Sequence, residues 1–171
     1  MRQVIFLALL LPWLGGCTHP RSATIVGTSV GMEPVSFRLP RFGGGEDALA
    51  AHRGHPVLLD LWASWCPPCR EELPVLSALA AAQPRLVVLT ANQGESAPVV
   101  ARAVRELHLR LPVLLDREQA YGGAYASIGL PTAVILGDDG RIAAVVTGEE
   151  SLAEWQAILA RAERAPAGAA R

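Results

Sequence analysis

Two cysteines stand three residues apart in the segment Trp65-Cys66-Pro67-Pro68-Cys69. The segment follows an apolar run typical of a buried strand and opens a run typical of a helix. On a helix, positions i and i+3 share one face with Cβ atoms about 5–6 Å apart, and a disulfide needs Cα atoms about 4.4–6.8 Å apart. The pair can therefore close and open a disulfide with little backbone movement, as reversible redox chemistry requires.

The two cysteines are expected to have different roles. Cys66 should lie at the helix N-terminus, where free amides and the helix dipole favour a thiolate. Because the thiolate is the species that attacks a disulfide, we assign Cys66 as the nucleophile and Cys69, one turn deeper, as the resolving cysteine. Pro67 and Pro68 fit the first helical turn and remove two N–H donors, which argues against an oxidant that strongly stabilises its thiolate.

Two other uses of the cysteine pair are weaker. A structural zinc site needs four ligands, and the chain has neither a second Cys-x-x-Cys nor a suitable His pair. A permanently closed structural disulfide would not need the placement between strand and helix. The sequence therefore favours a redox pair and calls for no metal and no cofactor beyond the disulfide itself.

Two carboxylates are expected near this pair. Asp60 lies within the buried strand, so its pKa should rise, and it could take and return the proton of Cys69. The alternative is a structural residue turned towards a partner or solvent. Glu72 follows Cys69 by three residues on the same helical face and could act on the same proton. The alternative for Glu72 is a solvated surface glutamate like Glu71.

The remaining pattern predicts the elements that position these residues. Strands are expected at 34–40, 57–62, 86–90, 111–115, 133–136 and 141–147, and helices at 67–82, 97–108, 118–127 and 151–164, with a helical turn at 46–52. Asp138-Asp139-Gly140 predicts a hairpin, and Ser151 with Glu154 forms a capping box. Helix-linked strands followed by a hairpin predict an α/β domain with a mixed central sheet.

The N-terminus indicates export. Arg2 precedes a short apolar run at 4–11, which is too short to span a membrane. Leu14-Gly15-Gly16-Cys17 resembles a bacterial lipoprotein box, which implies that Cys17 is lipidated and holds the domain at a bilayer. An ordinary cleaved signal with a coincidental cysteine is the alternative. We expect a signal peptide at 1–16, a tether at 17–33, the folded domain at 34–164 and a flexible tail at 165–171.

Length and charge narrow the remaining possibilities. The chain has 171 residues, which suits one domain. Its formal net charge of −1 does not favour nucleic acid as a partner. By default we expect a monomer.

The segment Val57-Leu-Leu-Asp-Leu-Trp-Ala-Ser-Trp-Cys-Pro-Pro-Cys-Arg-Glu-Glu-Leu-Pro74 resembles the active-site segment of the TlpA-like branch of the thioredoxin superfamily. Gly129-Leu-Pro-Thr132 resembles the second signature of that branch, and the resemblance covers about residues 34–162. It implies a thioredoxin fold with a strand–helix insertion around 86–115. It also implies a cis proline at Pro131 and a helix kink at Pro74.

The resemblance also implies a function. Members of the branch reduce disulfides outside the cytoplasm, for example in cytochrome c maturation, and receive electrons from a transmembrane thiol carrier. Glu72 matches an acidic position that tunes their active site. Asp60 matches the buried acid of thioredoxin, where many TlpA-like members carry Asn, so which acid relays the proton stays open. Substrate contacts are assigned to the residues on either side of Cys66 and of Pro131, namely Trp65, Pro67, Leu130 and Thr132.

The expected protein is thus a lipid-anchored, periplasm-facing thiol–disulfide oxidoreductase of the cell envelope that reduces oxidised envelope proteins. One alternative is an oxidant that donates disulfides. Another is a copper-handling lipoprotein without enzymatic activity that uses the two thiolates as soft Cu(I) ligands.

Overall fold

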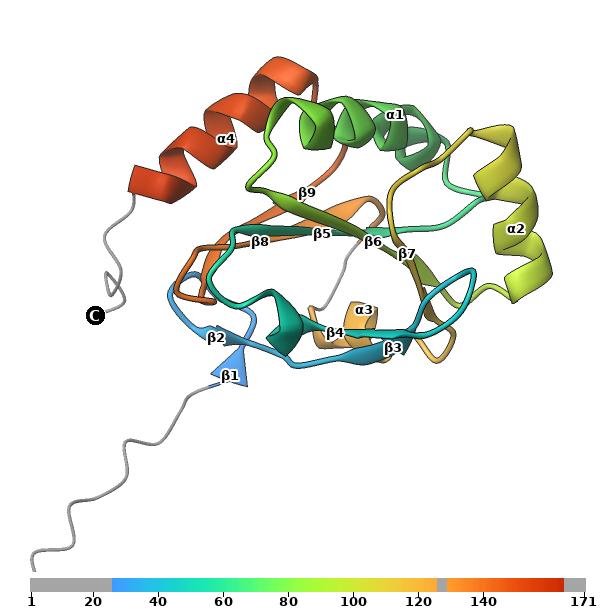
Figure 1. The fold of residues 1–171 in the computed structure, drawn as a ribbon, viewed down its shortest axis with the longest axis horizontal. Coiled ribbons are helices and arrows are strands. Elements are labelled where there is room, and N and C mark those ends of the chain that lie inside the picture. Colours follow the sequence, from blue (N-terminus) through green and yellow to red (C-terminus); the bar gives the residue numbers. More distant parts are fainter. Residues whose placement is uncertain (1–25, 126–128, 165–171) are drawn as a thin grey trace, which may run out of the picture.

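The computed structural model describes residues 26–125 and 129–164 (Figure 1). The predicted signal peptide at 1–16, the lipidation site Cys17 and the tail at 165–171 lie outside these residues, as does most of the tether. None of the helices in the described part of the chain is both long and apolar enough to cross a membrane.

A mixed five-stranded sheet with strand order β7-β6-β5-β8-β9 forms the centre of the molecule. Its strands are β5 (Val57–Trp62), β6 (Val87–Gln93), β7 (Val113–Asp116), β8 (Thr132–Leu136) and β9 (Ile142–Thr147). Strand β5 pairs in parallel with β6 and antiparallel with β8. Every residue of β5 is buried, as expected for a central strand covered on both faces.

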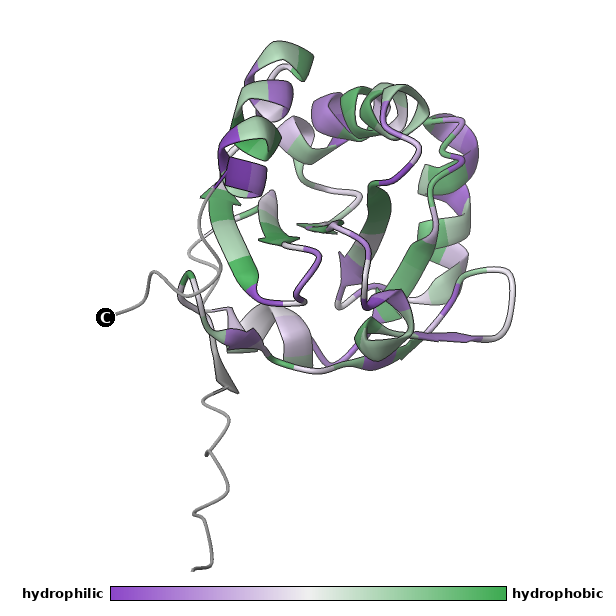
Figure 2. Cartoon of the chain, turned by 60° about the vertical axis from the view of Figure 1, so that its left-hand side comes forward, coloured by the Kyte–Doolittle hydropathy of each residue, from purple (hydrophilic) through white to green (hydrophobic). Residues whose placement is uncertain are grey.

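Helices cover both faces of this sheet. Helices α1 (Pro67–Ala82) and α4 (Leu152–Arg164) pack together on one face, where Leu76 and Leu79 meet Trp155 and Leu159. Helix α2 (Ala97–Glu106) extends this layer beside the start of α1 (Figure 1). The short α3 (Ala120–Ala124) lies against the other face with the N-terminal strands. The strands of the sheet are mostly apolar, whereas the helices alternate between apolar and polar residues (Figure 2).

The α/β architecture predicted from the sequence is confirmed, and its central elements match closely. Strand β5 and helix α1 have the predicted bounds. The capping box is present, since Ser151 Oγ donates to Glu154 Oε2 at 2.6 Å and accepts from Glu154 N–H at 3.3 Å. The hairpin between β8 and β9 also forms, with Gly140 at φ 77°.

The N-terminal part differs from the prediction. In place of one strand at 34–40, the structure has β1 (Val26–Gly27) paired with β2 (Glu33–Pro34), and β3 (Arg38–Pro40) paired with β4 (Glu46–Ala48). The predicted helical turn is wrong for 46–48 and is limited to a 3₁₀ helix at Leu49–His52. Glycines 43–45, all at positive φ, let the chain reverse tightly between β3 and β4.

Two later helices are shorter than predicted. Helix α2 ends at Glu106, and α3 begins at Ala120. The start of α3 is fixed by Asp116, whose carboxylate accepts the N–H groups of Ala120, Tyr121 and Gly122 at 3.0–3.2 Å. Residues 126–128 of the predicted helix lie outside the described part of the chain.

Candidate active site

Cys66 and Cys69 form a disulfide at the junction of β5 and α1, with Cα atoms 5.4 Å apart. Cys66 is the N-cap residue of α1 in extended backbone conformation (φ −91°, ψ 107°). Its side chain is 3 % exposed and that of Cys69 is 0 % exposed. The spacing thus gives the predicted geometry, with Cys66 nearer to solvent.

The first helical turn offers Cys66 a single early amide. Pro67 and Pro68 occupy the first two positions of α1 and have no N–H to donate. The first N–H of the helix belongs to Cys69, and it donates to Cys66 Sγ at 3.3 Å. This end of α1 therefore favours a negative charge on Cys66 less than a helix with all its early amides would.

Asp60 is wholly buried in the middle of β5. Its register partners are Thr90 on β6 and Ala133 on β8. Neither carboxylate oxygen has a hydrogen-bond partner among the described residues. Burial raises the pKa of Asp60 well above its ordinary value, and the nearby charge of Glu72 raises this pKa further.

Glu72 is 1 % exposed on the inner face of α1, so the solvated alternative is wrong for it. Its Oε1 atom accepts the indole N–H of Trp155 and the backbone N–H of Glu150, both at 3.1 Å. Its Oε2 atom has no partner in the described part of the chain. Burial raises the pKa of Glu72 to about 7, although the two hydrogen bonds oppose the shift.

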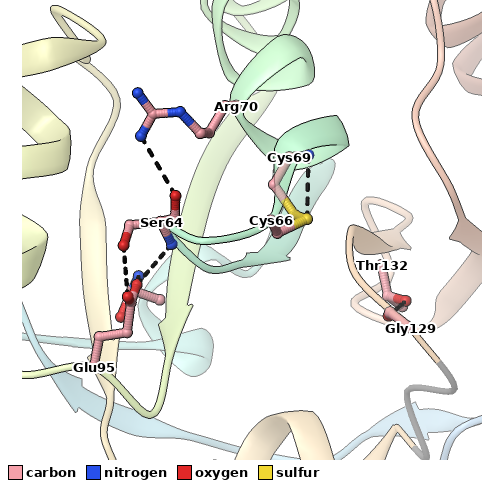
Figure 3. Close-up of a disulfide and its surroundings, with 8 residues drawn as sticks. Ser64, Cys66, Cys69, Arg70, Glu95, Gly129 and Thr132 are labelled. Carbon is pink, nitrogen blue, oxygen red and sulfur yellow. Dashed lines mark hydrogen bonds between the residues drawn. A yellow bond between two sulfur atoms is a disulfide. The ribbon is translucent and has the colours of Figure 1, made fainter.

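The loop before β8 faces the disulfide (Figure 3). The Leu130–Pro131 peptide bond is cis. Leu130 packs into the apolar cluster that contains both cysteines. Thr132 is buried, and its hydroxyl donates to the Gly129 carbonyl at 2.9 Å, so this side chain is engaged within its own loop.

The residues on either side of Cys66 in the sequence are exposed. The Trp65 side chain is 71 % exposed directly before Cys66, and Pro67 is exposed directly after it. Exposed apolar rings beside a redox pair suit contact with another polypeptide. Among the predicted substrate contacts, Trp65, Pro67 and Leu130 flank the disulfide, whereas the Thr132 side chain is turned inwards.

A further carboxylate holds the loop that leads into the cysteines (Figure 3). Glu95, which follows β6, accepts the backbone N–H of Ser64 at 2.7 Å and its hydroxyl at 2.6 Å. The Ser64 carbonyl accepts from Arg70 at 3.4 Å. Sequence reasoning missed this contact, although the carboxyl ends of neighbouring parallel strands meet at one edge of a sheet, which brings the residues after β5 and β6 together.

The described residues also form a cavity away from the cysteines. A cavity of about 530 Å³ lies between the β8–β9 hairpin and the end of α4, with Leu136, Arg141 and Leu159 in its wall. It opens at the end of the sheet opposite to the cysteines. Within the described residues, no group of three or more His, Cys, Asp or Glu side chains is placed to hold a metal ion.

A comparison with known protein families matches residues 30–159 to the family named Redoxin. The chain belongs to the redoxin family. This redoxin is 31 % identical over 151 residues to thiol-disulfide oxidoreductase ResA of Geobacillus thermodenitrificans, with 86 % of each chain covered. It is also 32 % identical over 119 residues to sporulation thiol-disulfide oxidoreductase A of Bacillus subtilis, covering 65 % of this chain and 72 % of the relative.

Solved structures agree with these relatives. A Chlorobium tepidum protein described as a thiol:disulfide interchange protein DsbE superposes with a TM-score of 0.73 at 25 % identity. The match covers 80 % of this redoxin and 99 % of that chain. The redoxin is thus a TlpA-like thiol–disulfide oxidoreductase with a thioredoxin fold and a redox-active Cys66–Cys69 disulfide.

Proposed function

We propose that this redoxin reduces disulfides of proteins in the bacterial cell envelope, with cytochrome c maturation as one setting. The observation that carries the proposal is the position of Cys66, which lies at the tip of α1 beside an exposed Trp65, with the buried Asp60 on the preceding strand and the buried Glu72 on the same helix. A dithiol in this position can meet a folded or unfolded polypeptide, and the two acids would handle its protons.

The exchange proceeds in two steps. In the reduced protein, the Cys66 thiolate attacks one sulfur of the substrate disulfide, forms a mixed disulfide and releases one substrate thiolate. The thiolate of Cys69 then attacks Cys66 Sγ, the second substrate thiolate leaves, and the Cys66–Cys69 disulfide closes. Two electrons pass from the protein to the substrate. A transmembrane thiol carrier is the proposed donor that returns them.

Asp60 and Glu72 are proposed to handle the proton of Cys69. Cys69 is wholly buried, so its thiol cannot lose a proton directly to bulk water. Glu72 lies on the same buried face of α1, and its pKa of about 7 keeps both of its protonation states populated near neutral pH. Asp60 interacts electrostatically with Glu72 and has no competing hydrogen bond among the described residues. The two acids would therefore act as one coupled relay.

The direction of exchange follows from how the reduced form is stabilised. A dithiol protein such as DsbA is a strong oxidant because a stable thiolate favours its reduced form over its disulfide form. In this redoxin, Pro67 and Pro68 withdraw two donors from Cys66, which leaves the Cys69 N–H as the first amide of the helix. A less stable thiolate makes the dithiol a better reductant, which supports reduction over disulfide donation.

Substrate contact is proposed at the surface on both sides of the disulfide. Trp65 and Pro67 would supply apolar contact, and the backbone of Leu130 would supply hydrogen bonds to an extended substrate strand. The Pro131 carbonyl already accepts the N–H of Gly148 at 3.0 Å, and Thr132 pairs with Leu61 and Thr147 in the sheet. The inward hydroxyl of Thr132 would hold the Gly129 carbonyl in place and would not itself touch the substrate.

The location is proposed from the N-terminal sequence. After cleavage of residues 1–16, lipids on Cys17 would hold the domain at the periplasmic side of a membrane. Replacing Cys17 by Ala in cells should move the protein from the membrane fraction to the soluble fraction. Retention of the variant in the membrane fraction, with an unlipidated mass, would contradict the anchor.

The reduction potential of the Cys66–Cys69 pair tests the direction of exchange. The purified protein is equilibrated in glutathione or dithiothreitol buffers, and the thiol content is measured at each potential. A value near that of thioredoxin, about −270 mV, supports a reductase, and a value near that of the oxidant DsbA, about −120 mV, makes the protein a disulfide donor.

A further inference from the structure

The loop between β5 and the cysteines is held through one carboxylate. Glu95 Oε2 accepts the backbone N–H of Ser64 at 2.7 Å, and Glu95 Oε1 accepts the Ser64 hydroxyl at 2.6 Å. The side-chain amide of Asn92 donates to the same Oε2 atom at 2.6 Å. Each Glu95 oxygen therefore has a donor, and Asn92, buried near the end of β6, fixes the direction of the carboxylate.

Ser64 is the second residue of a tight turn. The N–H of Cys66 donates to the Ala63 carbonyl at 3.2 Å, which closes the turn over residues 63–66. The third residue of the turn is the exposed Trp65, and the fourth is the nucleophile Cys66. The orientation of this turn therefore sets both the direction of Cys66 Sγ and the place of the Trp65 ring.

The same turn has a weaker contact on the other side. The Ser64 carbonyl accepts from Arg70 at 3.4 Å, and Arg70 forms an ion pair with Glu106 at 3.3 Å. Glu106 is exposed, and exposed ion pairs contribute little. The Glu95 contact has shorter hydrogen bonds, joins a charged acceptor to two donors of one residue and is half-buried, so it is the stronger restraint on the turn.

We propose that Glu95 is a positioning residue of the oxidoreductase, which holds the turn at residues 63–66 so that Cys66 Sγ and Trp65 meet a disulfide in a fixed orientation. The same sulfur takes part whether the substrate is reduced or oxidised. The proposal therefore rests on thiol–disulfide exchange itself and not on its direction. It gives the segment after β6 a role in catalysis, because this segment carries Glu95.

The test measures how fast the reduced, full-length protein attacks a small aromatic disulfide as a function of pH. The profile yields the pKa of the attacking thiol and the limiting rate constant of the thiolate, and urea unfolding of each variant shows that it is folded under the assay conditions. Loss of position lowers the limiting rate constant, whereas loss of stability alone moves only the unfolding midpoint. We expect Glu95→Ala to lower the limiting rate constant about tenfold, since small misplacements of reacting groups slow catalysis strongly.

A conservative variant separates position from charge. The amide of Glu95→Gln can accept the Ser64 N–H and donate to the Ser64 hydroxyl, so we expect it to keep most of the rate. If Gln is as slow as Ala, the charge matters and the positioning role is overturned. Glu118→Gln is the matched control, because it removes an exposed carboxylate that contacts neither Ser64 nor Arg70.

A substitution at Ser64 tests the same contact without changing Glu95, in case the Glu95 variant does not fold. Ser64→Ala removes the 2.6 Å hydrogen bond and keeps the backbone N–H, so the limiting rate constant should fall at least about threefold. In the double variant with Glu95→Ala, the effects should not add, because both changes remove the same contact. If Glu95→Ala does not fold, Ser64→Ala decides alone. A limiting rate constant within twofold of the unmodified protein in folded Glu95→Ala or in Ser64→Ala would overturn the proposal.

Discussion

Two sets of carboxylates near the cysteines in the fold differ in their hydrogen bonding: the acid pair, which is Asp60 on β5 and Glu72 on α1, and Glu95, which holds the loop before Cys66. In the acid pair, three of the four carboxylate oxygens have no hydrogen-bond partner among the described residues. In the loop, both oxygens of Glu95 receive short hydrogen bonds. Burial without donors raises a carboxyl pKa and suits proton transfer, whereas a carboxylate with several donors suits the fixing of a backbone.

The comparison assumes that both regions serve the cysteine pair, so the largest effect should come from the pair itself. Cys66→Ser should lower the exchange rate by at least about a thousandfold, because the attacking sulfur is gone. Cys69→Ser should still attack but should accumulate the mixed disulfide, which mass spectrometry of the trapped complex detects. Accumulation with Cys66→Ser in place of Cys69→Ser would reverse the two roles.

Asp60→Asn tests whether the acid pair transfers protons. The second step, in which Cys69 must lose its proton, should slow about a hundredfold, and the attack of Cys66 should change much less. Stopped-flow measurement of mixed-disulfide formation and decay separates the two steps. Thr90→Val, which alters a buried polar neighbour in register with Asp60, is the matched control and should leave both steps unchanged. Equal slowing of both steps by Asp60→Asn would assign it a structural role.

Glu72→Gln tests the same region through stability. The pKa of Glu72 is about 7 in the folded protein and 4.5 in its ordinary state, so the folded state holds more protons between these values. Stability should therefore fall as pH rises from 4 to 8, and the variant should lack this loss. The stability gained by the variant relative to the unmodified protein should grow by on the order of 2–3 kcal/mol over this range.

Urea unfolding of the oxidised protein at pH 4 and pH 8 measures this gap. Glu71→Gln, the exposed neighbour on α1, controls for general effects of removing a glutamate charge. A gap between Glu72→Gln and the unmodified protein that is the same at both pH values would show that burial does not perturb Glu72.

The smallest effect is expected at the start of α4, where the N–H of Glu150 donates to Glu72 of the acid pair. Ser151→Ala removes the cap of α4, next to the Glu150 N–H that donates to Glu72. The free energy of unfolding should fall by about 1 kcal/mol. The exchange rate should stay within twofold, because the cap itself touches neither cysteine nor either acid. A larger loss of rate would mean that the acid pair depends on the start of α4 more strongly than the hydrogen bonds there indicate.

The comparison also explains which parts of the site could be predicted from sequence. The cysteine spacing, the buried strand around Asp60 and the inner face of α1 are local patterns, and the structure agrees with each of them. The hydrogen bonds to Glu72 are not local, because their donors lie 78 and 83 residues away in the chain. The partner of Ser64 lies 31 residues away on another strand end. Hydrogen bonds across such separations leave no periodic signal in the chain.

The N-terminal strands could not be predicted from the sequence for a related reason. Strands of two or three residues, such as β2 and β3, carry too few alternating positions for periodicity to define them. Their pairing is decided by the glycine turn and by the sheet against which they pack. Of these features, only the glycines at 43–45 leave a signal in the sequence, and that signal indicates a turn without defining the strands on either side of it.

The hydrogen bond between Trp155 and Glu72 gives the protein an internal optical probe. The Trp155 indole is wholly buried, and its N–H donates to the carboxylate whose pKa is about 7. An indole N–H bonds more strongly to an ionised acceptor than to a neutral one. The fluorescence of Trp155 should therefore titrate with Glu72, so that the charge on the buried acid can be followed by light emission without any added label.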